Sequence, residues 1–226
     1  MSKHESLFAL QNGIVPWLFS LKGNIQNVEP LEVFKVYKPL DRGNTKLAKN
    51  ILSFNLLPIT TCEQHCAGCY DTRAMRYTGV RKKRYLNTSM AMHNEAKLEK
   101  MIVKQIIRSR TVDFVRLHVG GDFFSSAYVS MWGRIVKECS KVKPDVIFYT
   151  YTKTSHVEAL ESFGINVVLS EYKEGFNFAP LESVKALAKK YKGVVCPATL
   201  GDVGEGFCGS KCTACMKRKN VFFVEH

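Results

Sequence analysis

The sequence predicts an α/β fold in which about five to six parallel strands form a partial (β/α) barrel, followed by a C-terminal cysteine-rich extension. Three observations lead to this expectation. Apolar, strand-like runs alternate with amphipathic helical segments from residue 51 onward. The chain has 226 residues, which is short of the roughly 250 residues of a closed eight-stranded barrel. Six of its eight cysteines fall in two short groups with the same spacing.

The expected elements follow one another along three regions. Residues 1–50 form a leader that packs on the barrel, residues 51–195 form the partial barrel, and residues 196–226 form the extension. The leader contains a strand at 31–37 and a turn at 41–44, and residues 73–84 form a basic loop. Barrel strands are expected at 51–59, 114–119, 146–151, 166–170 and 193–196. Helices are expected from about Asn94, from Ser125 or Ser126 to about Cys139, at 156–163 and at 181–191.

The composition favours a cytoplasmic protein that has no membrane partner. No stretch reaches the ~18 to 20 uninterrupted apolar residues of a membrane span, and the apolar run Ile14–Leu21 is short and contains Pro16. The N-terminus lacks the small-residue cleavage site of a signal peptide. In a reducing cytoplasm, clustered cysteines are more often metal ligands or catalytic groups than disulfides.

The first cysteine group consists of Cys62, Cys66 and Cys69, which follow the strand expected at 51–59. Three thiolates on one loop can hold one face of a 4Fe-4S cluster, because Ala67 and Gly68 permit a tight bend. A cubane has four irons, so three cysteines leave one iron free for another ligand, as an open position does in a catalytic zinc site. The alternative is a structural zinc site, but no second cysteine pair follows at the usual distance.

This segment, with an aromatic residue directly after the third cysteine, resembles the radical S-adenosylmethionine (SAM) superfamily. The resemblance implies that Cys62, Cys66 and Cys69 hold a 4Fe-4S cluster, whose free iron binds the amino and carboxylate groups of SAM. An electron from the cluster then cleaves SAM to a 5′-deoxyadenosyl radical, which abstracts hydrogen from a substrate. The resemblance also implies that Tyr70 lies beside the adenine, and that a reducing partner such as flavodoxin or ferredoxin supplies the electron.

Further cofactor contacts are expected where the other strands end. Gly120, Gly121 and Asp122 follow the strand at 114–119, at the edge where α/β barrels build their active sites. In the superfamily, a glycine-rich turn at this place binds the ammonium group of SAM, and here Asp122 replaces the usual glutamate. Thr152 and Ser170 follow the next two strands and are candidate contacts to the ribose or the methionine carboxylate, although either one alone is more often simply a polar residue at a strand end. No catalytic residue toward the substrate is assigned.

A closer resemblance is to the bacteriophage "gene product 88" family. It covers the middle of the chain and implies no substrate. A phage protein of this kind would act in the cytoplasm of the host. The similar segments are residues 55–58, the cysteine loop ending at Cys69-Tyr70, residues 116–124 and residues 148–153.

The second cysteine group consists of Cys196, Cys208, Cys212 and Cys215, and its last three members repeat the spacing of the first group. Four thiolates fill all the ligand positions of a metal site. Such a site is expected to transfer electrons or to hold the C-terminal segment in place. The repeated spacing favours a second 4Fe-4S cluster, and zinc is the competing metal because four thiolates bind it tetrahedrally. If Cys196 ends a barrel strand, this site lies at the same barrel edge as the first. Cys139, in contrast, is expected to be a buried apolar residue.

The net charge of +13 favours an anionic partner. Basic residues of this kind bind phosphates or simply face solvent. Three functions stay open: a radical SAM enzyme acting on a nucleic acid or nucleotide, a compact activating enzyme acting on a protein partner, and a non-enzymatic iron-sulfur or zinc protein that binds nucleic acid. The basic residues gather in two places, one holding Arg73, Arg76, Arg81, Lys82, Lys83 and Arg84 and the other Lys211, Lys217, Arg218 and Lys219.

Overall fold

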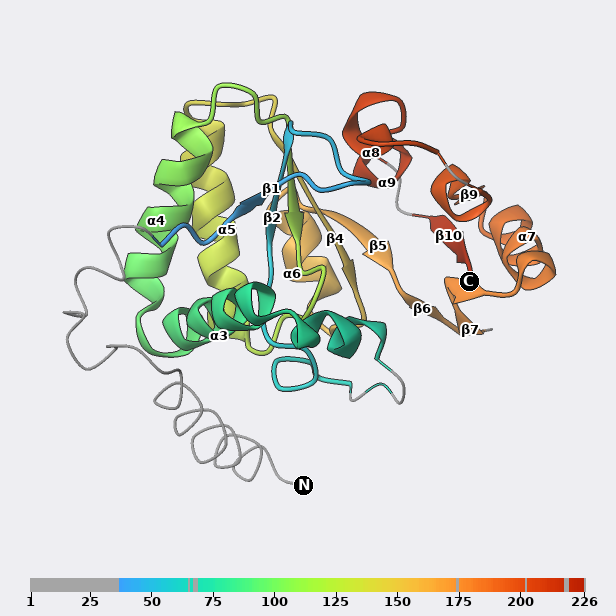
Figure 1. Ribbon diagram of the computed structural model, residues 1–226, viewed down its shortest axis with the longest axis horizontal. Helices are drawn as coiled ribbons and strands as arrows, with labels where there is room; N and C mark the ends of the chain where they lie inside the picture. Colours follow the sequence, from blue (N-terminus) through green and yellow to red (C-terminus); the bar gives the residue numbers. More distant parts are fainter. Residues whose placement is uncertain are drawn as a thin grey trace. The chain divides into compact units, whose positions relative to one another are not determined.

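The computed structural model describes residues 37–64, 66, 69–173, 175–201, 203–217 and 220–225 (Figure 1). The chain divides into two compact units, Met1–Lys38 and Pro39–His226, and the description below concerns the second. Of the strand expected at 31–37, only Tyr37 belongs to the described residues. The region boundaries expected at residues 50 and 195 stay predictions.

A five-stranded sheet in the order β1-β2-β3-β4-β5 forms the centre of this unit. Strand β1 is antiparallel to β2, and β2 to β5 are parallel to one another. Among the described residues, no pairing closes this sheet into a barrel. Four expected barrel strands are present, the first of them shorter than expected. The strands are β1 (Asp41–Arg42), β2 (Ile51–Phe54), β3 (Phe114–Leu117), β4 (Ile147–Thr152) and β5 (Asn166–Leu169).

The connections between the parallel strands are helical. Helix α5 begins where the sequence predicted, because the Ser125 hydroxyl accepts a hydrogen bond from the Tyr128 amide at 3.2 Å. No described helix combines the length and the apolar character that crossing a bilayer requires. The elements are the 3-10 helix η2 (Tyr70–Arg76), α3 (Thr78–His93), α4 (Glu95–Arg108), α5 (Ser126–Ser140) and α6 (Val157–Ser162).

Helices η2 and α3 correct the prediction of a basic loop at residues 73–84. Helix α3 lacks a continuous apolar stripe, since Arg84, Asn87 and Thr88 are among its buried residues. These side chains are buried through specific partners. The Asn87 amide, for example, donates to the Asn55 carbonyl at 2.8 Å. A helix that buries polar side chains leaves little hydrophobic periodicity in the sequence.

The two faces of the sheet bury different kinds of side chain, because successive residues of a strand point to opposite faces. One face is apolar and is covered by helices, and Trp132 of α5 packs edge-on against Phe54 with ring centroids 5.3 Å apart. The opposite face, which we call the polar face, has a polar row across its middle. The residues in register along this row are Ser53, Arg116, Tyr149 and Asn166.

The C-terminal part adds a second, three-stranded sheet in the order β8-β10-β9. The strand expected at 193–196 is therefore not part of the main sheet, since β9 pairs with β10 instead. Val184 and Leu187 of α7 pack on Phe222 of this small sheet. The elements are β6 (Glu171–Tyr172), β7 (Gly175–Phe176), β8 (Phe178–Ala179), α7 (Leu181–Lys190), β9 (Val194–Val195), η3 (Pro197–Thr199), α8 (Phe207–Ser210), α9 (Ala214–Lys217) and β10 (Val221–Val224).

Candidate functional site

The carboxyl edge of the main sheet brings the first cysteine group beside the turn at Gly120–Asp122. The chain leaving β2 runs next to this turn, because the Leu56 amide donates to the Gly120 carbonyl at 2.9 Å. Cys62 lies near enough to Asp122 for the carboxylate to raise the pKa of its thiol. The structure therefore places the three-cysteine loop and the Gly-Gly-Asp turn at the ends of adjacent strands, where parallel α/β sheets bind ligands.

The thiols of the first group differ in their surroundings. The pKa of Cys62 is raised to about 12, chiefly by burial and to a lesser extent by Asp122, Cys69 and Cys66. Cys66 is exposed and lies 3.3 Å from the Lys153 ammonium nitrogen, so a cation stands beside its sulfur. The side chain of Tyr70, expected beside the adenine, lies outside the described residues, as do the loop residues His65, Ala67 and Gly68.

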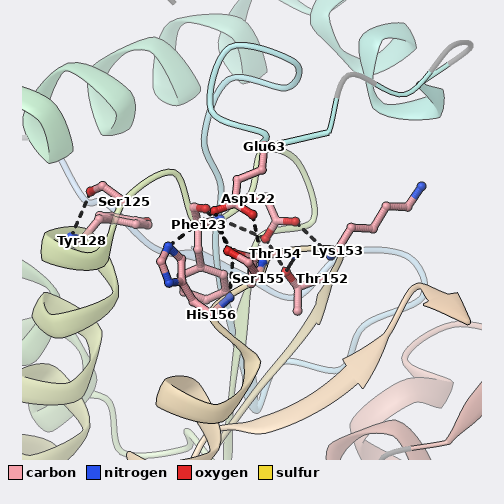
Figure 2. Close-up of polar contacts among 10 residues, drawn as sticks. All are labelled: Glu63, Asp122, Phe123, Ser125, Tyr128, Thr152, Lys153, Thr154, Ser155 and His156. Carbon is pink, nitrogen blue, oxygen red and sulfur yellow. Dashed lines mark hydrogen bonds and ion pairs between the residues drawn. The ribbon is translucent and has the colours of Figure 1, made fainter.

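Asp122 is buried and held from three directions (Figure 2). Its carboxylate accepts hydrogen bonds from the Thr152 hydroxyl at 2.6 Å, the Phe123 amide at 2.9 Å and the Lys153 amide at 3.1 Å. Burial raises the pKa of this carboxyl, and the three donors act against that rise. Thr152, expected as a cofactor contact, thus positions Asp122. Ser170, the other expected contact, lies next to Thr152, since its amide donates to the Thr152 carbonyl at 3.0 Å.

The two glycines of the turn permit close packing of the loops. A Cβ atom at Gly120 would lie 1.8 Å from a carboxylate oxygen of Asp71. Gly121 has a φ of 77°, and a Cβ atom there would lie 2.5 Å from the Thr61 hydroxyl. The sequence assigned these glycines to close approach of a cofactor. In the structure, the protein's own loops already require them.

A buried ion pair lies beneath Gly120. Arg84 of α3 pairs with Asp71 of η2, and their side chains are only 7% and 4% exposed. Burial raises the pKa of Asp71, whereas Arg84 and then Arg116 lower it. This pair joins the segment that follows the first cysteine group to α3 and to the Gly120 turn.

Glu63 attaches the cysteine loop to the turn between β4 and α6 (Figure 2). Its carboxylate accepts hydrogen bonds from the Ser155 amide at 2.9 Å and from the Ser155 hydroxyl at 3.3 Å. The same carboxylate lies 3.4 Å from the Nε2 atom of His156. The sequence analysis assigned no role to these residues, because a contact between positions 92 residues apart leaves no local pattern.

The second cysteine group lies at the opposite end of the main sheet. The Asn50 side chain, just before β2, donates to the Gly209 carbonyl at 3.0 Å. Asn166, the first residue of β5, donates to the Cys215 carbonyl at 3.0 Å. In Figure 1, helices α8 and α9 lie toward one end of the main sheet, and the loop that follows β2 lies at the other end. The condition for a shared edge, that Cys196 ends a strand of the main sheet, is therefore not met, because β9 joins the small sheet.

The four thiols of the second group are neighbours. The pKa of Cys208 is raised to about 11, chiefly by burial and to a lesser extent by Cys215, Cys196 and Cys212. Burial also raises the pKa values of Cys196 and Cys215. Cys139 is fully buried in α5, as expected.

Neither group has the arrangement of a closed metal site. Within the described ranges, no three or more histidine, cysteine, aspartate or glutamate side chains are arranged so that they could hold a metal ion.

The basic stretch 73–84 is only partly available to an anionic partner. Lys83 pairs with Asp41, and Arg84 is buried with Asp71. Arg76 is exposed beside the first cysteine group and lies 4.8 Å over the ring of Tyr77, which is 55% exposed. Exposed positive charge is thus next to an exposed aromatic ring at this edge.

The "Gene product 88" family matches residues 38–197. The Gene 88 protein of Mycobacterium phage L5 is 28% identical over 143 residues, covering 54% of this chain and 58% of the relative. The Gene 88 protein of Mycobacterium phage D29 is 28% identical over 144 residues with the same coverage, so the chain spans 58% of the length of these relatives. No solved structure matches. Because the family match extends over more than half of the chain, the protein belongs to the gene product 88 family.

Proposed function

We propose that this protein is a radical SAM enzyme whose first cysteine group binds a 4Fe-4S cluster and SAM. The observation that supports this most directly is the position of a three-cysteine loop beside the Gly120–Asp122 turn, at the ends of adjacent parallel strands. When bound, the cluster supplies the electron that cleaves the sulfonium bond of SAM to a 5′-deoxyadenosyl radical for hydrogen abstraction.

The donor set at this edge fits such a group chemically. Thiolates are the ligands of iron-sulfur clusters, and three of them leave one iron of a cubane for SAM. Lys153 stands beside Cys66 and offsets the negative charge of a thiolate. Asp122 accepts three hydrogen bonds from the protein, whereas a carboxylate offers about four acceptor sites. One site is left for the amino group of SAM.

The second cysteine group, in this proposal, binds a further 4Fe-4S cluster or a zinc ion. The substrate is a nucleic acid or a nucleotide. Support for this substrate class comes from Arg76 and Tyr77, because a base stacks on an exposed aromatic ring while a neighbouring cation attracts phosphate. The electron donor is a reducing protein of the flavodoxin or ferredoxin class.

The test uses the full chain, loaded with iron and sulfide without oxygen, reduced with dithionite and incubated with SAM. We expect 5′-deoxyadenosine and methionine from the unaltered protein and none from Cys66→Ala, with Cys139→Ala as the matched cysteine control. A reduced, iron-loaded protein that forms no 5′-deoxyadenosine would overturn the proposal, and so would a failure to load iron at the first group.

The substrate class is tested separately by binding to tRNA and to DNA at increasing salt. We expect binding that weakens with salt and weakens further in Arg76→Gln. If the protein ignores both polyanions at physiological salt while still cleaving SAM, the nucleic-acid substrate is rejected and an activating role on a protein partner takes its place.

A further inference from the structure

A short segment at the end of β4 touches both halves of the candidate site. We call residues 152–156 the bridging segment. At its start, the Thr152 hydroxyl donates to the carboxylate of Asp122 at 2.6 Å. Three residues later, the amide and the hydroxyl of Ser155 donate to the carboxylate of Glu63 at 2.9 and 3.3 Å. Figure 2 shows both carboxylates reaching this segment, which therefore joins the cysteine loop to the Gly120–Asp122 turn.

The bridging segment is itself fixed by its own hydrogen bonds. Thr154 at its centre is 4% exposed. The Thr154 amide donates to the Thr152 hydroxyl at 2.9 Å, and the Thr154 hydroxyl donates to the Phe123 carbonyl at 3.4 Å. The amide of His156 donates to the Thr154 hydroxyl at 3.4 Å. The segment is thus a support with a defined position relative to the turn that carries Asp122.

Glu63 attaches the cysteine loop to this support. It directly follows Cys62 in the chain, and its side chain is 28% exposed. A carboxylate that is partly removed from water needs hydrogen-bond donors, and Ser155 supplies two of them. The Nε2 atom of His156 lies 3.4 Å from the same carboxylate. These contacts restrict where the loop can lie, because they fix a side chain one residue away from the first cysteine.

The attachment lies beside the carboxylate that the proposed function gives to SAM. The charge of Glu63 acts on Asp122, since it contributes to the raised pKa of that carboxyl after burial. In the proposed function, SAM contacts both an iron held by the first cysteine group and the carboxylate of Asp122. A ligand that must reach two loops binds more weakly when only a fraction of the molecules has both loops in place.

We propose that Glu63 is a positioning residue of the first cysteine group. Through its hydrogen bonds to Ser155, it holds the cysteine loop at a fixed place relative to Asp122, so that one SAM molecule can reach both. The inference rests on the proposed function for its consequence on SAM. The attachment itself is a property of the chain without any cofactor and is tested separately.

The first test measures hydrogen exchange of the Ser155 amide by NMR in the metal-free full chain. Glu63→Ala removes the acceptor, so the amide should exchange about 2- to 10-fold faster, as expected for the loss of one hydrogen bond. Glu63→Gln keeps an acceptor oxygen at the same distance along the side chain and should retain most of the protection. Glu158→Ala is the matched control, because it removes an exposed carboxylate from the neighbouring helix α6.

The second test measures SAM binding by equilibrium dialysis in the full chain loaded with iron and sulfide, without a reductant. Iron per chain should be the same in Glu63→Ala as in the parent, because all three cysteines of the first group are present. SAM should bind about 10-fold more weakly to Glu63→Ala, the effect of losing a hydrogen bond to a charged group. Glu63→Gln should bind SAM nearly as the parent does, and Glu158→Ala should bind it equally well.

Each outcome decides one part of the inference. Unchanged exchange of the Ser155 amide in Glu63→Ala overturns the attachment. Equal SAM affinity in the parent and in Glu63→Ala overturns the positioning role, and so does a loss of iron in Glu63→Ala or an equal weakening in Glu63→Gln. Glu63→Asp, whose shorter side chain withdraws the carboxylate from Ser155, should behave as Glu63→Ala and decides the question if the latter does not fold.

Failure of the proposed function gives a different result. A loaded parent protein that binds no SAM overturns the proposed enzyme and, with it, the role of Glu63 toward SAM. The exchange of the Ser155 amide still decides whether Glu63 attaches the cysteine loop to the bridging segment.

Discussion

The two cysteine groups have the same spacing but lie in opposite surroundings. The first follows β2 at the carboxyl edge of the sheet, where Cys66 is exposed and a lysine from another loop reaches it. The second lies near the amino ends of the strands, where Cys208 and Cys215 pack against a buried cluster that includes Ile51 and Tyr149 of the polar face. The spacing determines which cysteines share a loop. The position of that loop on the sheet determines the solvent exposure, the neighbouring charges and the packing of the sulfurs.

The number of thiols and the kind of cation also differ between the groups. Cys196 brings the second group to four thiols, which saturates a metal, whereas three thiols leave a position open. Lys153 is a flexible cation at an exposed edge, and Arg116 is a planar cation fixed within the sheet. The proposed function therefore assigns reactivity to the first group and a structural or electron-relaying role to the second.

Removing one ligand from each group has the largest expected effect. Cys66→Ala should abolish SAM cleavage and leave the metal of the second group in place, because a cluster does not survive on two thiolates. Cys212→Ala should remove roughly half of the iron if both groups hold similar clusters. Iron, sulfide and zinc per chain, measured in protein purified without oxygen, check both outcomes.

Two results would contradict the assignment of the groups. SAM cleavage by Cys66→Ala would show that the first group is not the reactive one. Zinc at the second group would overturn the assignment of two clusters and leave one cluster and one structural metal.

The buried pair of Arg84 and Asp71 gives the next largest effect. Arg84→Met leaves a buried carboxylate without its cation, which should lower the free energy of unfolding by about 3–5 kcal/mol. Lys141→Met breaks an exposed pair with Glu138 and serves as the control, with an expected loss below about 1 kcal/mol. Urea denaturation measures both. Equal losses in the two variants would contradict the structural role given to the buried pair at the first group.

The sequence predicts the parts of the fold that have a local periodic signal. Strands β2 to β5 and helices α4 to α7 follow apolar patterns and lie close to the expected residues. Helix α3 was missed because its inner side buries Arg84, Asn87 and Thr88. The pairing of β9 with β10 was missed because two short strands, whose paired residues are 27 positions apart in the chain, have no local pattern that selects a partner.

For the candidate site, the sequence supplies the cysteines and the Gly120–Asp122 turn but not their partners. Cysteine spacing and a glycine-rich turn are local patterns. The contacts Glu63–Ser155 and Lys153–Cys66 join positions 92 and 87 residues apart, so only the folded chain reveals them. Arg116 and Tyr151 lie in strands, and the sequence of a strand does not predict which part of the chain covers each face of the sheet. The chemistry at both groups stays a prediction.

A buried histidine makes the carboxyl edge sensitive to acid. His118 follows β3, is 3% exposed, and burial lowers its pKa to about 3. Below about pH 6.5 the unfolded chain binds a proton that the native histidine does not. His118 therefore does not reduce the free energy of unfolding above about pH 6.5, and it reduces it increasingly as the pH falls toward 3.

Because His118 binds a proton only in the unfolded chain in this range, it should lower the free energy of unfolding by about 1 kcal/mol between pH 6.5 and 5.5. Asp71 and Asp122 act in the opposite direction, because their pKa values are raised. The difference between the parent and His118→Gln isolates the histidine, since glutamine does not titrate. Parallel stability-pH curves for the two proteins would show that His118 is not the source of acid sensitivity at this edge.

The smallest effect concerns the cation beside Cys66. The Lys153 ammonium nitrogen lies 3.3 Å from the Cys66 sulfur, and an exposed charge pair contributes about 0.2–1 kcal/mol. Lys153→Met should therefore slow alkylation of Cys66 by iodoacetamide about 1.5- to 5-fold, as measured by mass spectrometry of the metal-free protein. Cys212 in the same sample is the internal control and should react as before. If both cysteines slowed together, the two groups would share one electrostatic environment, and their separation into an open edge and a packed face would not hold.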